Sequence, residues 1–156
     1  MADETQVRER MWKAMAQSPF VMVGIEGDGQ HSEPLTAQLD PDANSEFWFY
    51  VGRDNRVASG GRAMAQFVSK GHDVFACISG TLTEETREEI KDKYWSKQVE
   101  AWFPEGRNDP QLMMLRFDLD SAEIWESDLG LSGRLKLMTG ATIAPHEAGE
   151  HVEVAL

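Results

Sequence analysis

Apolar positions near the start of the chain recur at the spacing of one helical face. In the segment 4–17, ETQVRERMWKAMAQ, these positions are Val7, Met11, Ala14 and Met15. Side chains separated by four, seven and eight residues lie on one side of an α-helix. The sequence therefore predicts an amphipathic helix over 4–17, with its apolar stripe turned toward the protein core.

Short apolar runs separated by turn residues follow this helix and predict a series of strands. The turns GDGQ and KGHD contain the Gly and Asp residues that are typical of tight hairpins. A short helix is expected to start near Asp54 or Asn55, which are both good N-cap residues. The strands expected in this half of the chain are 20–26, 31–39, 47–51, 63–69 and 74–83.

The second half of the chain contains one long polar and amphipathic segment. The residues 83–103 begin with acidic side chains, which favour a helix start, and we expect one long helix there. Two further strands are expected at 111–119 and 122–127. The segment 130–143 is interpreted as a short helix, and the polar tail that follows has no clear pattern. About seven strands joined by hairpins predict a mainly β fold, an antiparallel sheet that closes as a small barrel with flanking helices.

The composition narrows the class of protein. A chain of 156 residues has the length of one domain, so a single domain over 1–156 is expected. No apolar run approaches the roughly 20 residues of a membrane helix, and the charged start MADETQVRER lacks the apolar core of a secretion signal. The single cysteine is compatible with a reducing compartment. We therefore expect a cytoplasmic protein that does not bind membranes.

The chain is strongly acidic, so a local pair of arginines is more informative about function than it would be in a neutral chain. The formal net charge is −12, with 27 acidic residues against 15 basic ones. Nucleic-acid binding requires clustered Lys and Arg side chains, and the chain has no such cluster, so no nucleic-acid partner is expected. Arg53 and Arg56 stand out because they follow the apolar strand 47–51 directly. Guanidinium groups beside free backbone N–H groups would form a phosphate site, and the alternative is two surface arginines that balance nearby acidic residues.

Other candidate groups favour ordinary structural roles. The four histidines have no metal-site spacing, so no metal is predicted. Cys77 lies in an apolar strand and is interpreted as a buried, inert thiol. The glycines of GIEGDGQ precede a predicted strand and not a helix, which favours a hairpin over a dinucleotide loop. The tryptophans 48, 95 and 102 are expected in the core, although flat side chains also pack well against planar ligands and at subunit interfaces.

Several longer segments resemble a known family. These are EPLTAQLDPDANSEFWFYVGRDNRV, FACISGTL and YWSKQVEAWFPEGRNDPQLMMLRFDLDSAEIWES, together with the tail GEHVEVAL. They resemble the bacterial general stress proteins of the pyridoxamine-5'-phosphate-oxidase-like group, whose members are FMN-binding split barrels. The most specific parts are AWFPEG…DP and AEIW, and the resemblance covers nearly the whole chain.

The resemblance implies a homodimer with FMN in a crevice between its two subunits. The residues that match the flavin-lining strand are Pro34, Leu35, Thr36, Ala37 and Gln38. Those of the second strand, which would contribute backbone and apolar contacts, are Phe49, Tyr50 and Val51. The residues implied for the phosphate are Arg53, Asn55 and Arg56, and Trp102 or Trp125 is implied as a contribution of the partner subunit.

Three positions depart from the family pattern. Glu33 stands where an Arg is frequent, Val51 where a Thr is common, and Val57 where relatives of the oxidase carry a phosphate-binding Lys. A carboxylate near a phosphate is repulsive, so Glu33 either points away, pairs with an arginine, or weakens FMN binding.

The resemblance implies a flavin-binding stress-type protein, either an FMN-dependent oxidoreductase or a flavin-binding protein of unknown substrate. No side chain stands out as a catalytic acid, base or nucleophile. The alternative is a non-catalytic homodimer that has lost flavin and acts through protein contacts. Oxidation of pyridoxine phosphate is a weaker option, because the only close pair of basic residues in the last third is Arg134 and Lys136.

Overall fold

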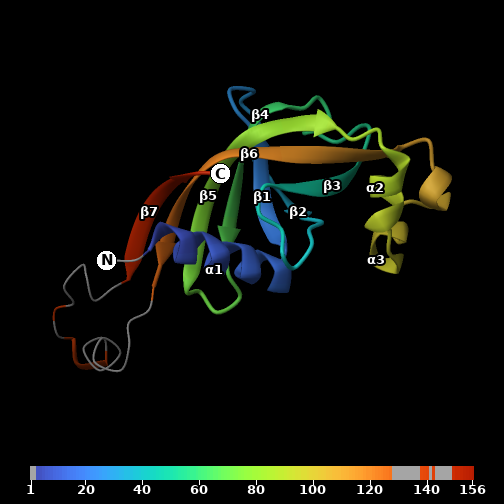
Figure 1. Ribbon diagram of the computed structural model, residues 1–156. Helices are drawn as coiled ribbons and strands as arrows, with labels where there is room; N and C mark the ends of the chain where they lie inside the picture. Colours follow the sequence, from blue (N-terminus) through green and yellow to red (C-terminus); the bar gives the residue numbers. More distant parts are fainter. Residues whose placement is uncertain (1–2, 128–137, 141, 143–148) are drawn as a thin grey trace.

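One antiparallel sheet of seven strands forms most of the described chain (Figure 1). The structure is a computed structural model that describes residues 3–127, 138–140, 142 and 149–156. The elements, in chain order, are α1 (Glu4–Gln17), β1 (Phe20–Ile25), β2 (Glu33–Thr36), β3 (Glu46–Gly52), β4 (Gly61–Val68), β5 (Val74–Glu84), α2 (Glu88–Lys93), α3 (Lys97–Glu100), a 3-10 turn (Gly106–Asn108), β6 (Leu112–Glu126) and β7 (Glu150–Ala155).

The sheet curls so that its two end strands approach each other. The strand order is β2-β1-β4-β5-β6-β3, and β7 also pairs with β6. The long strand β6 pairs with β3 over its first half and with β7 over its second half. An isolated bridge between Gln38 and Trp48 then connects the chain just after β2 to β3. The mainly β fold with a curled antiparallel sheet and flanking helices confirms the predicted fold class.

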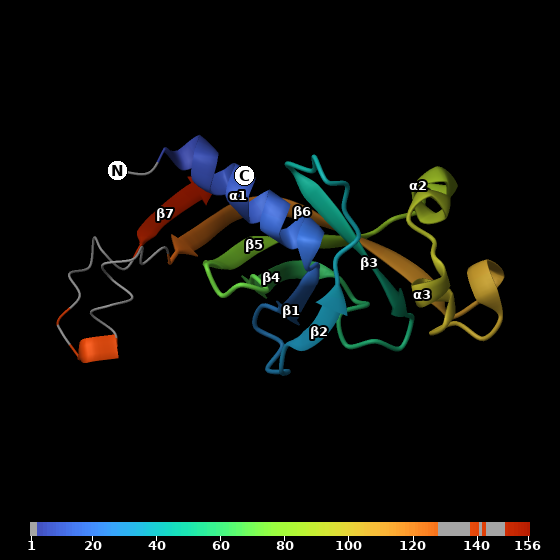
Figure 2. The ribbon, with the colours of Figure 1, turned by 90° about the horizontal axis from the view of Figure 1, so that it is seen from below.

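Helix α1 crosses the inner face of this sheet (Figure 2). Its buried side chains include Val7, Met11 and Met15 of the predicted apolar stripe, together with Trp12. Asp3 caps the helix, and its side chain accepts a hydrogen bond of 3.0 Å from the backbone N–H of Thr5. The prediction of an amphipathic helix over 4–17 is therefore confirmed.

Aromatic side chains of the central strands fill the core beneath α1. Phe47 stacks on Phe117 with ring centroids 5.0 Å apart, and Phe49 meets Phe47 edge-on at 5.5 Å. The ring of Trp12 approaches Phe47 from the helix at 6.2 Å. Close packing of this kind fixes the position of β3, whose far end leads into the candidate site.

The prediction of a single helix over 83–103 is wrong. Strand β5 continues to Glu84, because Leu82 and Glu84 pair with Phe117 and Leu115 of β6. Two short helices then replace the long one, and Trp95 lies in the break between them. Pairing along β6 competed with local helix propensity here, and tertiary contacts decided the outcome.

Four other predicted elements also differ. The strands expected at 111–119 and 122–127 form the single strand β6, which has an extra residue, Asp120, opposite the step from Ser79 to Gly80 of β5. The strand expected at 31–39 is limited to β2, and the helix expected near Asp54 or Asn55 is a series of turns. Most of the helix interpreted at 130–143 lies outside the described residues.

Within the described ranges, no helix is long and apolar enough to cross a membrane.

Candidate functional site

A large groove opens where the ends of β2 and β3 meet the segment that carries α3. Its volume is about 1030 Å³. The lining residues contributed by the sheet and the following turn are Glu33, Pro34, Leu35, Thr36, Gln38, Tyr50, Val51, Gly52, Asp54 and Asn55. Those of the α3 segment are Ser96, Gln98, Val99, Trp102, Phe103, Pro104, Glu105, Asp109 and Gln111. A volume of this size is at the upper end for small-molecule and cofactor sites.

A small apolar cluster holds the α3 side of the groove in place. Val99 and Phe103 pack on Leu112 of β6, and Tyr50 and Trp95 pack against them. This cluster is separate from the main core, so the contacts within the cluster are those that hold α3 against the sheet. The side chain of Ser96 caps α3 by accepting a hydrogen bond of 3.3 Å from the backbone N–H of Val99.

Asp109 shapes the loop on the same side. It is buried, and its two carboxylate oxygens accept hydrogen bonds from the backbone N–H groups of Glu105 at 3.2 Å and Gln111 at 2.9 Å. The AWFPEG…DP segment that carries the family resemblance therefore forms one wall of the groove. A single helix over 83–103 would not have produced this wall, which forms because the chain breaks into two short helices and a loop.

Trp102 offers a flat, accessible surface at this wall. Its side chain is 82% exposed although it lines the groove, so the expectation that it belongs to the core is wrong. Trp48, in contrast, is buried as expected, and Tyr94 stacks on it at 5.1 Å. A large exposed aromatic ring beside a groove is well placed to pack on a planar ligand.

A second, polar cavity of about 560 Å³ adjoins the groove. It is lined by Gln30, Glu33, Gly52, Asp54, Asn55 and Arg56, and four of these residues also line the larger groove. The two cavities therefore form a continuous space, apolar at one end and polar at the other. Such a space matches a ligand with a flat ring and an anionic tail.

The turn after β3 supplies the polar end. Successive backbone hydrogen bonds join Asn55 to Gly52 at 2.9 Å, Ala58 to Asn55 at 3.0 Å and Gly60 to Val57 at 3.0 Å. The Asn55 side chain accepts from the backbone N–H of Val57 at 2.9 Å. Val57 is fully buried and anchors the turn in the core, so this position could not present a Lys to a phosphate without rearrangement.

Arg56 lies in the polar cavity, where Glu33 holds it. Its Nε is 3.3 Å from Oε2 of Glu33, and its Nη1 donates to the backbone carbonyl of His31 at 2.9 Å. Of the three arrangements open to Glu33, the structure therefore shows pairing with an arginine. Among the described residues, the other carboxylate oxygen of Glu33, Oε1, is buried and has no hydrogen-bond partner.

The remaining predicted residues divide between the groove and other places. Arg53 lines neither cavity and pairs with Glu84 at 3.3 Å. Ala37 and Phe49 are buried in the main core. The other strand residues predicted to line the flavin, namely Pro34, Leu35, Thr36, Gln38, Tyr50 and Val51, do line the groove.

Tyr50 is poorly suited to act as a general base, because its hydroxyl group already makes a hydrogen bond within the protein. It donates to the backbone carbonyl of Lys91 at 2.6 Å. Burial raises the pKa of Tyr50 to about 12, and the Arg107 charge only partly offsets this. The phenol is therefore neutral at ordinary pH and connects α2 to the groove wall.

A buried carboxylate fixes the start of the segment that carries α2 and α3. Glu85 is 2% exposed, and its Oε1 accepts from Trp48 Nε1 at 3.0 Å and from Arg87 Nη2 at 2.7 Å. Arg116 Nη1 lies 3.8 Å from the same oxygen. These hydrogen bonds, chiefly that of Arg87, lower the pKa of Glu85 to about 2.

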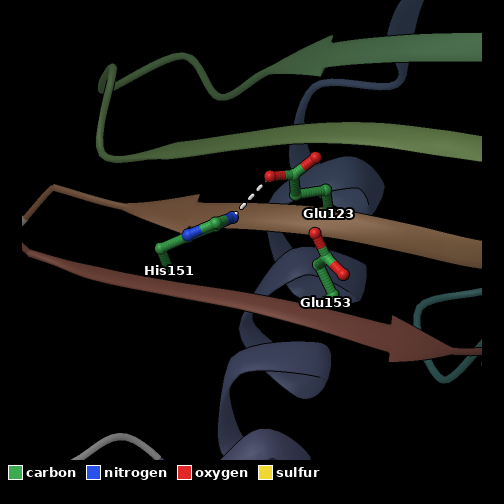
Figure 3. Close-up of side chains that lie close together, drawn as sticks. All are labelled: Glu123, His151 and Glu153. Atoms are coloured by element: carbon green, nitrogen blue, oxygen red, sulfur yellow. Dashed lines mark hydrogen bonds and ion pairs between the residues drawn. The ribbon is translucent and has the colours of Figure 1, made fainter.

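Trp125 lies away from the groove of its own chain. It stands on β6 and stacks on His151 of β7, with ring centroids 4.9 Å apart and planes 4° from parallel. Beside it, His151 Nε2 is 2.6 Å from Glu123 Oε1, and Glu153 completes a group whose possible ligand atoms lie within 4.8 Å of one another (Figure 3). Within the described part of the chain, this group is a partly exposed cross-strand contact between a histidine and a carboxylate, with a second carboxylate next to it.

Cys77 differs from its prediction. It is a free thiol on the outward face of β5, and it is only partly buried. Burial is still the main cause that raises its pKa, which makes it a weak nucleophile at neutral pH.

The curled antiparallel sheet with its flanking helices defines a mainly β fold of the split-barrel type. Comparison with known proteins identifies its family. The family model described as "Pyridoxamine 5'-phosphate oxidase like" matches residues 6–146, and the chain belongs to this family.

Solved structures agree with this assignment. The general stress FMN/FAD binding protein of Xanthomonas citri is 39% identical, with a TM-score of 0.75 over 81% of this chain and 93% of its own. A general stress family protein of Xanthomonas campestris pv. campestris is also 39% identical, with a TM-score of 0.75 over 84% and 94% of the two chains. A protein of Jannaschia sp. that is assigned as general stress protein 26 is 26% identical, with a TM-score of 0.82 over 99% and 100%. A search of curated proteins found no match.

Proposed function

We propose that this protein binds FMN in the two-part groove, as a homodimer of the general stress type, and that it acts in the cytoplasm as a flavin-dependent oxidoreductase or flavin carrier. The observation that carries the proposal is the continuity of an apolar groove with a polar cavity that contains Arg56. The 39% identity to a protein described as FMN/FAD binding supports the same ligand class.

The residues of the groove fit the parts of FMN in order along its length. The flat ring matches the groove between the outward face of β2 and the exposed ring of Trp102. Glu33 lines both cavities, at the place where the hydroxyl groups of the ribityl chain would lie. The phosphate matches the polar cavity, where Arg56 and the side chain of Asn55 lie.

Glu33 makes phosphate binding a competition. The carboxylate already neutralises Arg56 through the 3.3 Å ion pair, and the whole chain carries a net charge of −12. An incoming phosphate must therefore share Arg56 with Glu33 or displace it. Both effects lower the affinity for the phosphate, so we expect FMN to bind only moderately more tightly than riboflavin.

Bound flavin would supply the redox chemistry, and the protein would supply position and environment. The side chains of the groove would hold the ring against an apolar wall, and those of the polar cavity would hold its polar tail. Tyr50 stays neutral, and its donated hydrogen bond to Lys91 leaves it no role as a base.

The central test is flavin titration with matched arginine variants. Fluorescence titration should give a dissociation constant for FMN below about 50 µM, which corresponds to a binding free energy of roughly −6 kcal/mol. Arg56→Ala should weaken the affinity for FMN about tenfold, or 1.4 kcal/mol, and should leave the affinity for riboflavin nearly unchanged. Arg53→Ala is the matched control, because Arg53 pairs with Glu84 outside both cavities.

A carboxylate variant tests the competition directly. Glu33→Gln removes the negative charge beside Arg56, so it should increase the affinity for FMN relative to the affinity for riboflavin. Absence of FMN binding in the wild-type protein would reject the flavin proposal and would favour the non-catalytic homodimer. Equal losses of FMN and riboflavin in Arg56→Ala would show that the phosphate lies elsewhere.

A further inference from the structure

We propose that Glu123, His151 and Glu153 form a binding site for a divalent transition-metal ion of the zinc type on the outward face of β6 and β7. None of the three residues lines the groove or the polar cavity. The inference is therefore independent of the proposed flavin function. It gives a role to a group of side chains that flavin binding does not use.

Strand pairing brings the three side chains together. Glu153 pairs directly with Glu123 across the β6–β7 ladder, and His151 stands two residues before Glu153. Positions two apart on a strand share one face of the sheet with the positions opposite them. Because 28 residues separate Glu123 from His151, the spacing of histidines along the sequence does not report this group.

The distances between the candidate ligand atoms are close to those of a metal site. One such atom from each residue lies within 4.8 Å of the other two, and Nε2 of His151 is 2.6 Å from Oε1 of Glu123 (Figure 3). Ligand atoms around a tetrahedral zinc ion are about 3.4 Å apart at the bond lengths of imidazole and carboxylate ligands. Small side-chain rotations would therefore admit the ion.

The imidazole ring of His151 is already held in a suitable orientation. It stacks on Trp125, with ring centroids 4.9 Å apart and planes 4° from parallel. Figure 3 shows the ring directed toward Glu123, with the carboxylate of Glu153 beside it. A ligand whose orientation is fixed in advance by its neighbours loses less conformational entropy when it binds.

The charges of the group favour a cation. Within the part of the chain that the structure describes, the side chain of Glu153 has no hydrogen bond or ion pair, and that of Glu123 contacts His151. Like charges directly opposite each other destabilise a strand pair. A divalent ion would neutralise both carboxylates and bind the imidazole nitrogen, whereas a protonated His151 carries only one positive charge.

The ligand set selects the class of ion. Zinc and its neighbours among the first-row metals bind imidazole nitrogen well, whereas Ca²⁺ and Mg²⁺ prefer oxygen ligands. Three protein ligands leave one position of a tetrahedral zinc site for water. Among the described strands, β7 pairs only with β6, so an ion bound to both would hold β7 in place and stabilise the folded protein.

The site is tested by zinc binding to the full chain after treatment with a chelator and dialysis. Competition with a chromogenic zinc chelator should show one Zn²⁺ per chain. His151→Gln should weaken zinc binding at least about tenfold, since even residues that only support a metal ligand have effects of this size. His72→Asn is the matched control, because it removes an imidazole from a turn at a positive φ that Asn tolerates, and it should bind zinc like the wild-type protein.

Two further measurements separate this site from zinc bound elsewhere. Glu153→Gln, a change at an exposed position, should also weaken zinc binding, and it provides the second test if His151→Gln does not fold. Zinc should raise the thermal unfolding midpoint of the wild-type protein but not that of His151→Gln. Ca²⁺ at equal concentration should not displace zinc.

Three results would overturn the proposal. These are a wild-type protein that binds no zinc, folded His151→Gln and Glu153→Gln proteins that bind zinc as the wild type does, and equal competition by Ca²⁺, which would exclude a nitrogen ligand. Failure of FMN binding would reject the proposed function and would leave the zinc result unaffected, because the two sites share no residue.

Discussion

Replacing Glu85 by glutamine removes the charge of a carboxylate that is 2% exposed while keeping its size. The structure gives this group three partners of different kinds: the indole N–H of Trp48 and the guanidinium groups of Arg87 and Arg116. Trp48 belongs to β3 and Arg116 to β6, whereas Glu85 begins the segment that leads to the groove wall. The variant therefore tests whether this ion pair network holds that segment on the sheet.

The magnitude follows from the pKa of Glu85. Its pKa falls from 4.5 to about 2 in the folded protein. A shift of one pKa unit corresponds to about 1.4 kcal/mol, so the charged carboxylate contributes up to about 3 kcal/mol at neutral pH, and about 2 kcal/mol after allowance for solvent at Arg87. Because the folded pKa is lowered, this stability is fully present above pH 4.5 and is lost as the pH falls toward 2.

Urea unfolding at neutral pH and near pH 3 measures this contribution. Glu85→Gln should lower the free energy of unfolding by about 2 kcal/mol at neutral pH. The difference from the wild-type protein should shrink by roughly half near pH 3, since part of the wild-type contribution has been lost there. Glu84→Gln is the control, because its partner Arg53 is half exposed and such pairs contribute little. A difference that is the same at both pH values would refute the assigned pKa, and a loss equal to that of the control would refute the role of the network.

Two further predictions concern the core and the groove wall. Met11→Ala should lower the free energy of unfolding by about 2–5 kcal/mol in urea titration, because Met11 is fully buried on the core-facing side of α1. Lys13→Ala on the exposed side of the same helix should change it little. Both tyrosines of the chain, Tyr50 and Tyr94, have pKa values raised by burial, so ultraviolet titration of the folded protein should show little phenolate at pH 10. The raised pKa means that this stabilisation is present below pH 10 and is lost as the pH rises toward 12; normal titration of both phenols in the folded protein would contradict the burial.

Much of the fold could be predicted because local signals and burial agreed. The apolar face of 4–17 and the strand 47–51 each carry a periodic pattern that one buried face requires. The long helix expected over 83–103 failed because the sequence shows only local propensity there. Leu82 and Glu84 instead pair with Phe117 and Leu115, which lie 35 and 31 residues further along the chain, and no local pattern predicts such pairings.

Some residues of the candidate site could be predicted from the sequence, and others could not. The residue types after β3 indicated a phosphate-binding turn, and Asn55 and Arg56 do lie in the polar cavity. The sequence treated Arg53 and Arg56 alike, whereas folding turned Arg53 toward Glu84 and Arg56 toward Glu33. Apart from Trp102, the groove residues between Ser96 and Gln111 were not predicted, because their position opposite β2 depends on the small apolar cluster around Val99.

The amino-acid sequence by itself determined the class of protein, the amphipathic first helix, most of the strands and the family, because these depend on patterns within short segments. The tertiary structure alone decided which side chains share a cavity, which arginine is held by Glu33, and which apolar residues stay outside. The physical reason is that a strand position has two possible faces and many possible neighbours. Only the pairing of distant strands selects the face that is buried, the face that is exposed, and the edge at which a groove can open.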